Sequence, residues 1–248
     1  MRFLIYAIQL KRIFTHVRRD VIMSKNRKAN LNDGCNPELV VGADFDGILE
    51  IPKIFAPKSI SIPTGFTPFT KREKALNSDD AICFFEKDPR FAEVLINPEA
   101  YISDLKRFRY VLPIDCSLYR DAPLAVQVTN IYRSRAIGSY YQRNGCNVYP
   151  FARWGNEFTY TTEYFPEKIA FLGLPKNSVV CIGTYGCIKS REDKYHFKAG
   201  LDAMLQTLEP KLVLVYGAMP SDVFKNYLND TKFVQYPDWT TRMHGGDC

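Results

Sequence analysis

The chain has 248 residues, enough for one large domain or two small ones, and its 46% hydrophobic and 24% charged content is ordinary for a globular protein. Seven scattered cysteines without a Cys-x-x-Cys pair, and three dispersed histidines, argue against a disulfide framework and a zinc cluster. The net charge of +6 is uneven, because residues 1–30 hold eight Lys or Arg against one acid and leave the remainder at −1. This charge balance argues against a dedicated duplex-DNA binder. The cysteines lie in apolar runs, as buried free thiols do, and this predicts a cytoplasmic location.

Residues 1–34 are predicted to be a basic extension outside the fold. Apolar residues recur at helical spacing in residues 1–22, which indicates an amphipathic basic helix too short in its apolar stretch to span a membrane. Two interpretations stay open. The segment is either an arm that binds a membrane surface or nucleic acid, or an upstream extension of a protein whose translation starts at Met23.

Residues 35–238 are predicted to form a single α/β domain, followed by a C-terminal tail at 239–248. The domain begins with a β-rich segment and continues with continuous apolar runs separated by helical patterns. The runs lie at residues 82–86, 110–114, 147–151, 178–182, 211–216 and 232–236. Apolar strands alternating with helices predict a mainly parallel sheet of about six βα units. An open sheet and a partial barrel both fit this pattern.

Two helices have clear boundaries in the sequence. The first is expected to run from a cap at Asp121 to about Asn144, with Pro123 in its first turn. The second is expected to begin at Ser190, because Ser190-x-x-Asp193 has the spacing of a capping box.

The loop between the fourth apolar run and the second helix reads GTYGCIKS, residues 183–190. A P-loop needs a second glycine before its Lys-Ser pair, and Ile188 occupies that position, so a true P-loop is not expected. A looser anion site made by Gly183, Thr184 and Gly186, with Lys189 as a point charge, remains possible because the loop leads to a helix N-terminus. The alternative is an ordinary strand–helix loop with a solvated lysine.

Other strand ends also carry polar side chains, and in parallel α/β sheets ligands bind beyond these ends. Asp115, Ser117 and Tyr216 are predicted as catalytic or positioning residues, and Arg120, Arg153 and Trp154 as further ligand contacts. Asp44 and Asp46 share one face of a strand, but an acidic turn is favoured over a metal pair. No metal site is predicted, and the cofactor is unknown.

Five segments resemble the domain-of-unknown-function family 4417: DCSLYRDAPLAVQ, NIYRSRAIGSYYQRNG, RWGNEFTY, SVVCIGTYGCIKSRED and KLVLVYGAMPSDVF. The resemblance runs from about residue 35 to 237 and implies a bacterial, phage or mobile-element protein without an assigned mechanism. Family members often carry histidine where Tyr185 stands here. A histidine base in this loop is therefore not expected.

Three functions are compatible with these patterns. The first is binding of a phosphate-bearing ligand, a nucleotide or a nucleic-acid end, at the strand ends. The second is an enzyme acting on such a ligand, with Asp115 as acid/base or metal ligand. The third is a protein-interaction module that binds host or phage machinery. A cleft that gathers Asp115, Arg153 and Thr184 favours the first two, whereas a filled sheet end with an exposed apolar patch favours the third.

Overall fold

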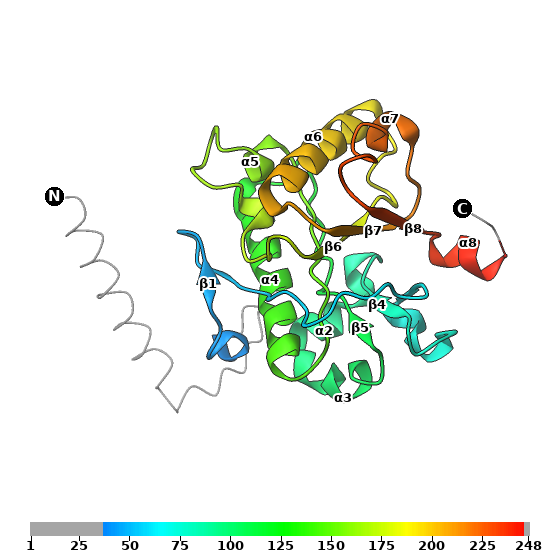
Figure 1. Cartoon of the computed structure of the whole chain (residues 1–248). Coiled ribbons are helices and arrows are strands. Elements are labelled where there is room, and N and C mark those ends of the chain that lie inside the picture. The colour runs from blue at the N-terminus through cyan, green and yellow to red at the C-terminus, as the bar shows by residue number, and fades with distance from the viewer. Residues whose placement is uncertain (1–36, 246–248) are drawn as a thin grey trace, which may run out of the picture.

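The computed structural model describes residues 37–245, so the predicted basic extension and the last three residues lie outside the described part. Figure 1 shows how its strands and helices are arranged. The strands are β1 (Phe45–Asp46), β2 (Ile51–Pro52), β3 (Phe66–Pro68), β4 (Ala81–Cys83), β5 (Tyr110–Val111), β6 (Val179–Gly183), β7 (Leu212–Tyr216) and β8 (Phe233–Tyr236). The α-helices are α2 (Ala92–Ile96), α3 (Ile102–Leu105), α4 (Leu124–Arg143), α5 (Glu157–Tyr160), α6 (Arg191–Leu208), α7 (Ser221–Phe224) and α8 (Trp239–Met243).

Two three-stranded parallel sheets form the centre of the protein. Their strand orders are β3-β4-β5 and β6-β7-β8, and both follow the order of the chain. Isolated parallel bridges join Val111 to Val148 and Phe151 to Cys181, so residues 148–151 connect one sheet to the other. The α/β class predicted from the apolar runs is confirmed.

The predicted number of six βα units needs correction. The run at 147–151 makes only isolated bridges, because Pro150 has no N–H with which to continue a ladder. An additional parallel strand, β3, lies in the segment that was predicted to be merely β-rich. The antiparallel pair β1–β2 completes this early part of the chain.

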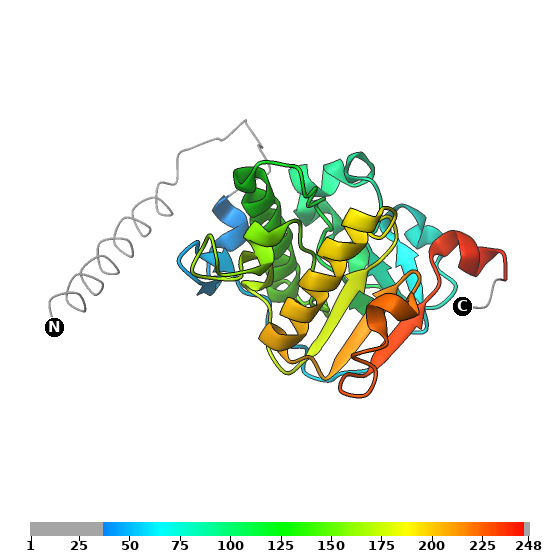
Figure 2. The same cartoon turned by 90° about the horizontal axis from the view of Figure 1, so that it is seen from above.

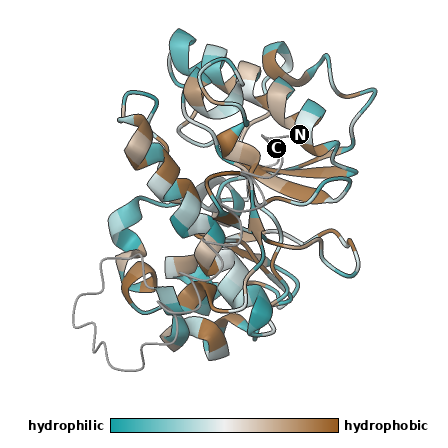
Figure 3. Ribbon diagram, turned by 90° about the vertical axis from the view of Figure 1, so that its left-hand side faces the viewer, coloured by the Kyte–Doolittle hydropathy of each residue, from teal (hydrophilic) through white to brown (hydrophobic). Residues whose placement is uncertain are grey.

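Apolar side chains on the two faces of the sheets fill separate parts of the core. One face gathers residues from both sheets into a single cluster, including Phe66, Tyr149 and Leu214. The opposite face of β6–β8 packs against α6, where Leu201 and Met204 are fully buried. Figure 2 shows the gold helix α6 lying across these strands, and Figure 3 shows that the strands are mainly hydrophobic. This burial on both faces explains the continuous apolar runs.

The predicted capping box at the start of α6 is confirmed. The Ser190 hydroxyl accepts a hydrogen bond from the Asp193 N–H at 3.0 Å, and the Ser190 N–H donates to the Asp193 carboxylate at 3.1 Å. The expected start of α4 at Asp121 is wrong. The helix begins at Leu124, and Pro123, which has no side chain able to cap, precedes it.

Residues 239–245, which were expected to be a tail, include helix α8. Its Arg242 bonds to Asp80, close to the start of β4. Within residues 37–245, every helix is too short or too polar to cross a membrane.

Candidate functional site

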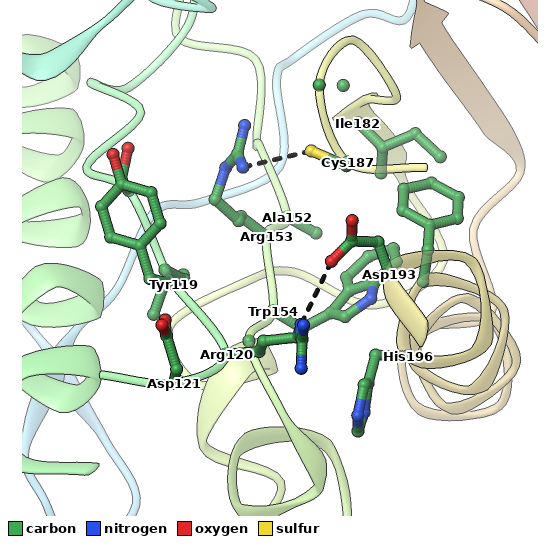
Figure 4. A pocket seen from close by; sticks show the side chains of 16 residues that line it. Tyr119, Arg120, Asp121, Ala152, Arg153, Trp154, Ile182, Cys187, Asp193 and His196 are labelled. Atoms are coloured by element: carbon green, nitrogen blue, oxygen red, sulfur yellow. Dashed lines mark hydrogen bonds and ion pairs between the residues drawn. The ribbon is translucent and has the colours of Figure 1, made fainter. Parts of the chain in front are cut away.

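A pocket of about 330 Å³ lies beyond the carboxyl end of β6 and beside the first turns of α6 (Figure 4). The strand contributes Ile182 and Gly183, and the loop that follows contributes Gly186 and Cys187. The remaining lining residues come from the 117–121 loop, the 152–155 segment and α6: Ser117, Leu118, Tyr119, Arg120, Asp121, Ala152, Arg153, Trp154, Gly155, Asp193, His196 and Phe197. The pocket therefore has the position expected of a ligand site in a parallel α/β sheet.

Arg153 is the most strongly fixed cation of this pocket. Its guanidinium forms a two-pronged ion pair with the carboxylate of Asp115, through Nε and a terminal nitrogen. The other terminal nitrogen lies 3.3 Å from the sulfur of Cys187. The Arg153 side chain is 20% exposed, whereas the Asp115 side chain is 5% exposed and stands behind it. Arg153 thus reaches the pocket from a buried anchor.

Burial raises the pKa of Asp115 to about 6, although the charge of Arg153 opposes this change. Burial also lowers the pKa of Arg153, but the charge of Asp115 outweighs it and moves the pKa above its ordinary value. The guanidinium therefore stays charged, while the carboxyl titrates close to neutral pH. A pocket with such a group is a typical place for binding or proton transfer.

A second set of charges joins the 117–121 loop to α6. Arg120 bonds to the carboxylates of Glu192, at 2.5 Å, and Asp193, at 3.1 Å. The side-chain amide of Asn156 donates to the backbone carbonyl of Arg120 at 2.6 Å. Arg120 is therefore neutralised by two acids and is less available to an anion than its charge alone suggests.

His196 lies one turn further along α6 and lines both this pocket and a second cavity. Its Nδ1 atom is 2.8 Å from the hydroxyl of Tyr160 and 3.7 Å from the carboxylate of Glu157. The imidazole is thereby oriented by groups outside the pocket.

Six of the ten predicted site residues line the pocket: Ser117, Arg120, Arg153, Trp154, Gly183 and Gly186. Asp115 lies behind Arg153. Thr184 is buried and donates from its hydroxyl to the Tyr216 carbonyl at 3.3 Å. Tyr216 is buried too, and its hydroxyl accepts the Trp239 N–H at 2.8 Å. Lys189 is exposed and does not line the pocket.

The sequence analysis did not find Tyr119, Asp121, Cys187, Asp193 or His196 as pocket residues. Asp121 and Asp193 were interpreted as helix caps, which is a sufficient local reason for an acid at those positions. Cys187 lies three residues before Ser190, which begins the capping box, and His196 lies three residues after Asp193, which ends it. A search of the whole loop and the first helical turn, instead of its glycines alone, would have included them.

The structure shows no metal-binding cluster of three or more His, Cys, Asp or Glu side chains within residues 37–245. Asp46 belongs to strand β1 and not to the expected acidic turn. Its carboxylate accepts the Gly173 N–H at 3.0 Å and lies 3.9 Å from the ammonium of Lys53. These contacts give Asp46 a structural role.

The fold and the pocket define an α/β protein with a polar cavity beyond the carboxyl ends of its parallel strands. The model of the Domain of unknown function (DUF4417) matches residues 43–237, and the chain belongs to this family, as its sequence motifs predicted. The match covers most of the described residues and all of the residues that line the pocket.

Two curated relatives are phage proteins. The chain is 34% identical to the Gene 1 protein of Mycobacterium phage D29 over 171 residues, which are 69% of this chain and 60% of that protein. It is 32% identical to the Gene 1 protein of Mycobacterium phage L5 over 165 residues, which are 63% of this chain and 69% of that protein. The chain thus spans well under two thirds of the D29 protein. No solved structure matches the chain.

Proposed function

We propose that the protein binds a phosphate-bearing ligand, a nucleotide or a nucleic-acid end, in the pocket beyond β6. The observation that carries this proposal is the guanidinium of Arg153, which Asp115 holds at the pocket wall. A guanidinium is planar, stays charged and matches the oxygens of a phosphate group. Because its anchor is buried, Arg153 loses little conformational freedom when an anion binds.

The geometry supports a smaller contribution of the loop after β6 to anion binding than the glycines of this loop led us to expect. Gly183 and Gly186 line the pocket, and Gly186 has a φ of +80°, a conformation that favours glycine. The N–H of Thr184 is used within the protein, because it donates to the Tyr216 carbonyl at 3.0 Å. Arg153 therefore provides the main positive charge.

The parallel strands that support the pocket form a partial barrel in this proposal. The strand order follows the chain in both sheets, and the last strand approaches the first. The rings of Phe66 and Tyr236 are 4.8 Å apart, and the Tyr236 hydroxyl donates to the Pro63 carbonyl at 2.8 Å. In such an arrangement the carboxyl ends of all strands face one side, where ligands bind in parallel barrels.

The proposal predicts that phosphate, mononucleotides or short 5′-phosphorylated oligonucleotides raise the melting temperature of the protein. Arg153→Ala removes most of the rise, because one charge-assisted contact contributes about 1.5–3 kcal/mol. The double variant Asp115→Asn with Arg153→Met gives the same loss without leaving a buried charge unpaired. The measurement is the ligand-dependent shift in thermal unfolding.

Lys211→Ala is the matched control, because Lys211 is an exposed cation next to the first residue of β7, at the opposite end of the sheet. This variant is expected to keep the full rise. Equal rises in wild type, both Arg153 variants and the control would contradict the proposed site.

An enzyme that acts on the same ligand is the second candidate. The observation that favours it is the pKa of Asp115, about 6, which suits proton transfer near neutral pH. The carboxylate reaches the pocket only through Arg153, so a direct role requires the ion pair to open. Phosphorus NMR of the same ligands incubated with the protein tests for turnover, and turnover that survives Asp115→Asn would contradict this role.

A further inference from the structure

Tyr119 projects from a loop that other segments of the protein hold in place. The Asp88 carboxylate accepts hydrogen bonds from the N–H and hydroxyl of Ser117, at 3.0 and 2.6 Å. On the other side, the Asn156 side chain donates to the Arg120 carbonyl at 2.6 Å. The backbone is thus clamped before and after Tyr119, which keeps the ring at a defined place on the pocket wall.

The ring that this loop presents is largely exposed. Tyr119 is 67% exposed and lines the pocket, and within residues 37–245 its side chain makes no hydrogen bond or ring contact. By contrast, Tyr149 is fully buried and its hydroxyl bonds to Ser61. In Figure 4 Tyr119 lies on the side of the pocket opposite α6. An exposed aromatic ring on a clamped backbone is available to stack on a ligand.

Asp121 adds a second free group to the same loop. It lines the pocket, and its carboxylate has no hydrogen-bond or ion-pair partner within residues 37–245. In Figure 4 the head group of Arg153 points toward Cys187, away from Asp121. A free carboxylate repels a second anion but accepts hydrogen bonds from O–H and N–H groups. The part of a ligand near Asp121 is therefore expected to carry hydrogen-bond donors and no negative charge.

We propose that the pocket binds one nucleotide unit, with the base of its nucleoside part stacked on Tyr119, its hydroxyl or amino donors on Asp121 and its phosphate toward Arg153. This assignment rests on the proposed phosphate site and adds the recognition of the base. The volume of about 330 Å³ is at the lower end of the range for small-ligand sites and suits a single unit. Stacking accepts any base, so adenine and uracil bind similarly. A free nucleotide and the terminal nucleotide of a strand share this chemistry.

The test is isothermal titration of the full chain with AMP, UMP, adenosine, ribose 5-phosphate and a 5′-phosphorylated hexanucleotide. AMP and UMP are expected to bind about tenfold more tightly than ribose 5-phosphate, the difference being the stacked base. Tyr119→Ala reduces AMP affinity to the ribose 5-phosphate level, whereas Tyr119→Phe retains it because the ring face remains. Tyr195→Ala is the control, since Tyr195 is 68% exposed on α6 but does not line this pocket.

The outcomes separate the nucleoside assignment from the phosphate site. Equal binding of AMP and ribose 5-phosphate, both lost in Arg153→Ala, overturns the nucleoside assignment and leaves the phosphate site intact. Adenosine binding that depends on Tyr119 but not on Arg153 supports the nucleoside assignment and overturns the phosphate site. Absence of binding by every probe overturns both. If AMP binds and the hexanucleotide binds more tightly than AMP, the ligand is a strand end. If the hexanucleotide binds more weakly than AMP, the ligand is a free nucleotide.

Discussion

Asp115 and Arg153 form a buried ion pair whose protonation state decides how much charge the pocket offers to an anion. Burial raises the pKa of Asp115 to about 6, Arg153 opposes this, and the charge of Asp88 adds to the rise. When Asp115 is ionised, it compensates the guanidinium. When Asp115 is protonated, the full positive charge of Arg153 is available. Because the pKa of the carboxyl is raised on folding, its contribution to the free energy of unfolding falls as pH rises from about 4 to about 6.

Sulfate binding is expected to tighten at least about fivefold between pH 7.5 and pH 5.5, because the fraction of protein with a neutral Asp115 rises over this interval. Sulfate keeps its charge in this range, whereas a phosphate ester loses one near pH 6. Asp115→Asn should bind sulfate equally at both pH values. Titration of wild type and variant by calorimetry measures both affinities, and a variant with the same pH dependence as wild type would assign the effect to another group.

The residues that sequence reasoning found in the pocket share one property, which is that they come shortly after a predicted apolar run. Arg153 and Gly183 are examples, because a parallel sheet brings such positions to one edge. Tyr119 could not be found in this way. Its importance depends on exposure and on the lack of a partner, and neither property is visible before the loop is placed against Asp88 and Asn156.

Helix α6 carries one wall of the pocket and depends on an unusually close contact with Trp154. The indole packs on Phe197, with 5.2 Å between ring centroids, and lies against Gly200 in the middle of the helix. A Cβ atom at position 200 would approach Trp154 to 2.2 Å. The absence of a side chain at Gly200 therefore lets the indole approach the helix closely.

Gly200→Ala is expected to destabilise the protein by about 1–2 kcal/mol, although alanine is the better helix former. The gain in helix propensity is about 0.5–1 kcal/mol, and overpacking a buried contact costs about 1–3 kcal/mol. Urea unfolding measures the net change, and tryptophan fluorescence reports the displacement of Trp154. Lys198→Ala, at a partly exposed position of the same helix, serves as the control. A stabilised Gly200→Ala variant with unchanged fluorescence would contradict the tight contact.

The two long helices differ in how well the sequence predicts their beginnings. The start of α6 is encoded locally, because Ser190 and Asp193 satisfy each other's hydrogen bonds. The start of α4 depends on side-chain contacts with the loop that precedes it. Gln127 in its first turn is fully buried and donates to the Ala122 carbonyl, and Asn130 donates to the Ser117 carbonyl. These contacts stabilise the irregular loop before α4 and leave Asp121 free of a capping role.

At the scale of the whole molecule, the apolar runs predicted the α/β class but not the connection between its two sheets. That connection consists of single bridges at Val148 and Phe151. The spacing of apolar residues in the sequence does not predict such isolated bridges. The closing contacts at the far edge are also long-range, since Tyr236 bonds to Pro63 across most of the chain. The order of the parallel strands and the closure of the sheet depend on such non-local pairs. For that reason the sequence patterns did not distinguish an open sheet from a partial barrel.

Helix α8 adds a further long-range connection, between the C-terminal segment and β3–β4. Both terminal nitrogens of Arg242 donate to the carboxylate of Asp80, at 2.8 and 2.9 Å. The hydroxyls of Thr64 and Thr67 donate to the same carboxylate, each at 2.9 Å. Burial alone would raise the pKa of Asp80, but the hydrogen bonds from Arg242, Thr67 and Thr64 lower it below its ordinary value. The pair therefore adds stability above about pH 4 that is lost as the carboxylate protonates.

Arg242→Ala is expected to lower the free energy of unfolding by about 3–5 kcal/mol at pH 7, because Asp80 stays fully buried without its counter-ion. The deficit should shrink toward pH 4.5, since burial then raises the pKa of Asp80 and the neutral acid costs less to bury. Urea unfolding at both pH values measures this difference. Arg109→Ala is the matched control, because its ion pair with Asp79 is exposed, and little change is expected at either pH. Equal deficits for Arg242→Ala at the two pH values would show that α8 contributes by packing alone.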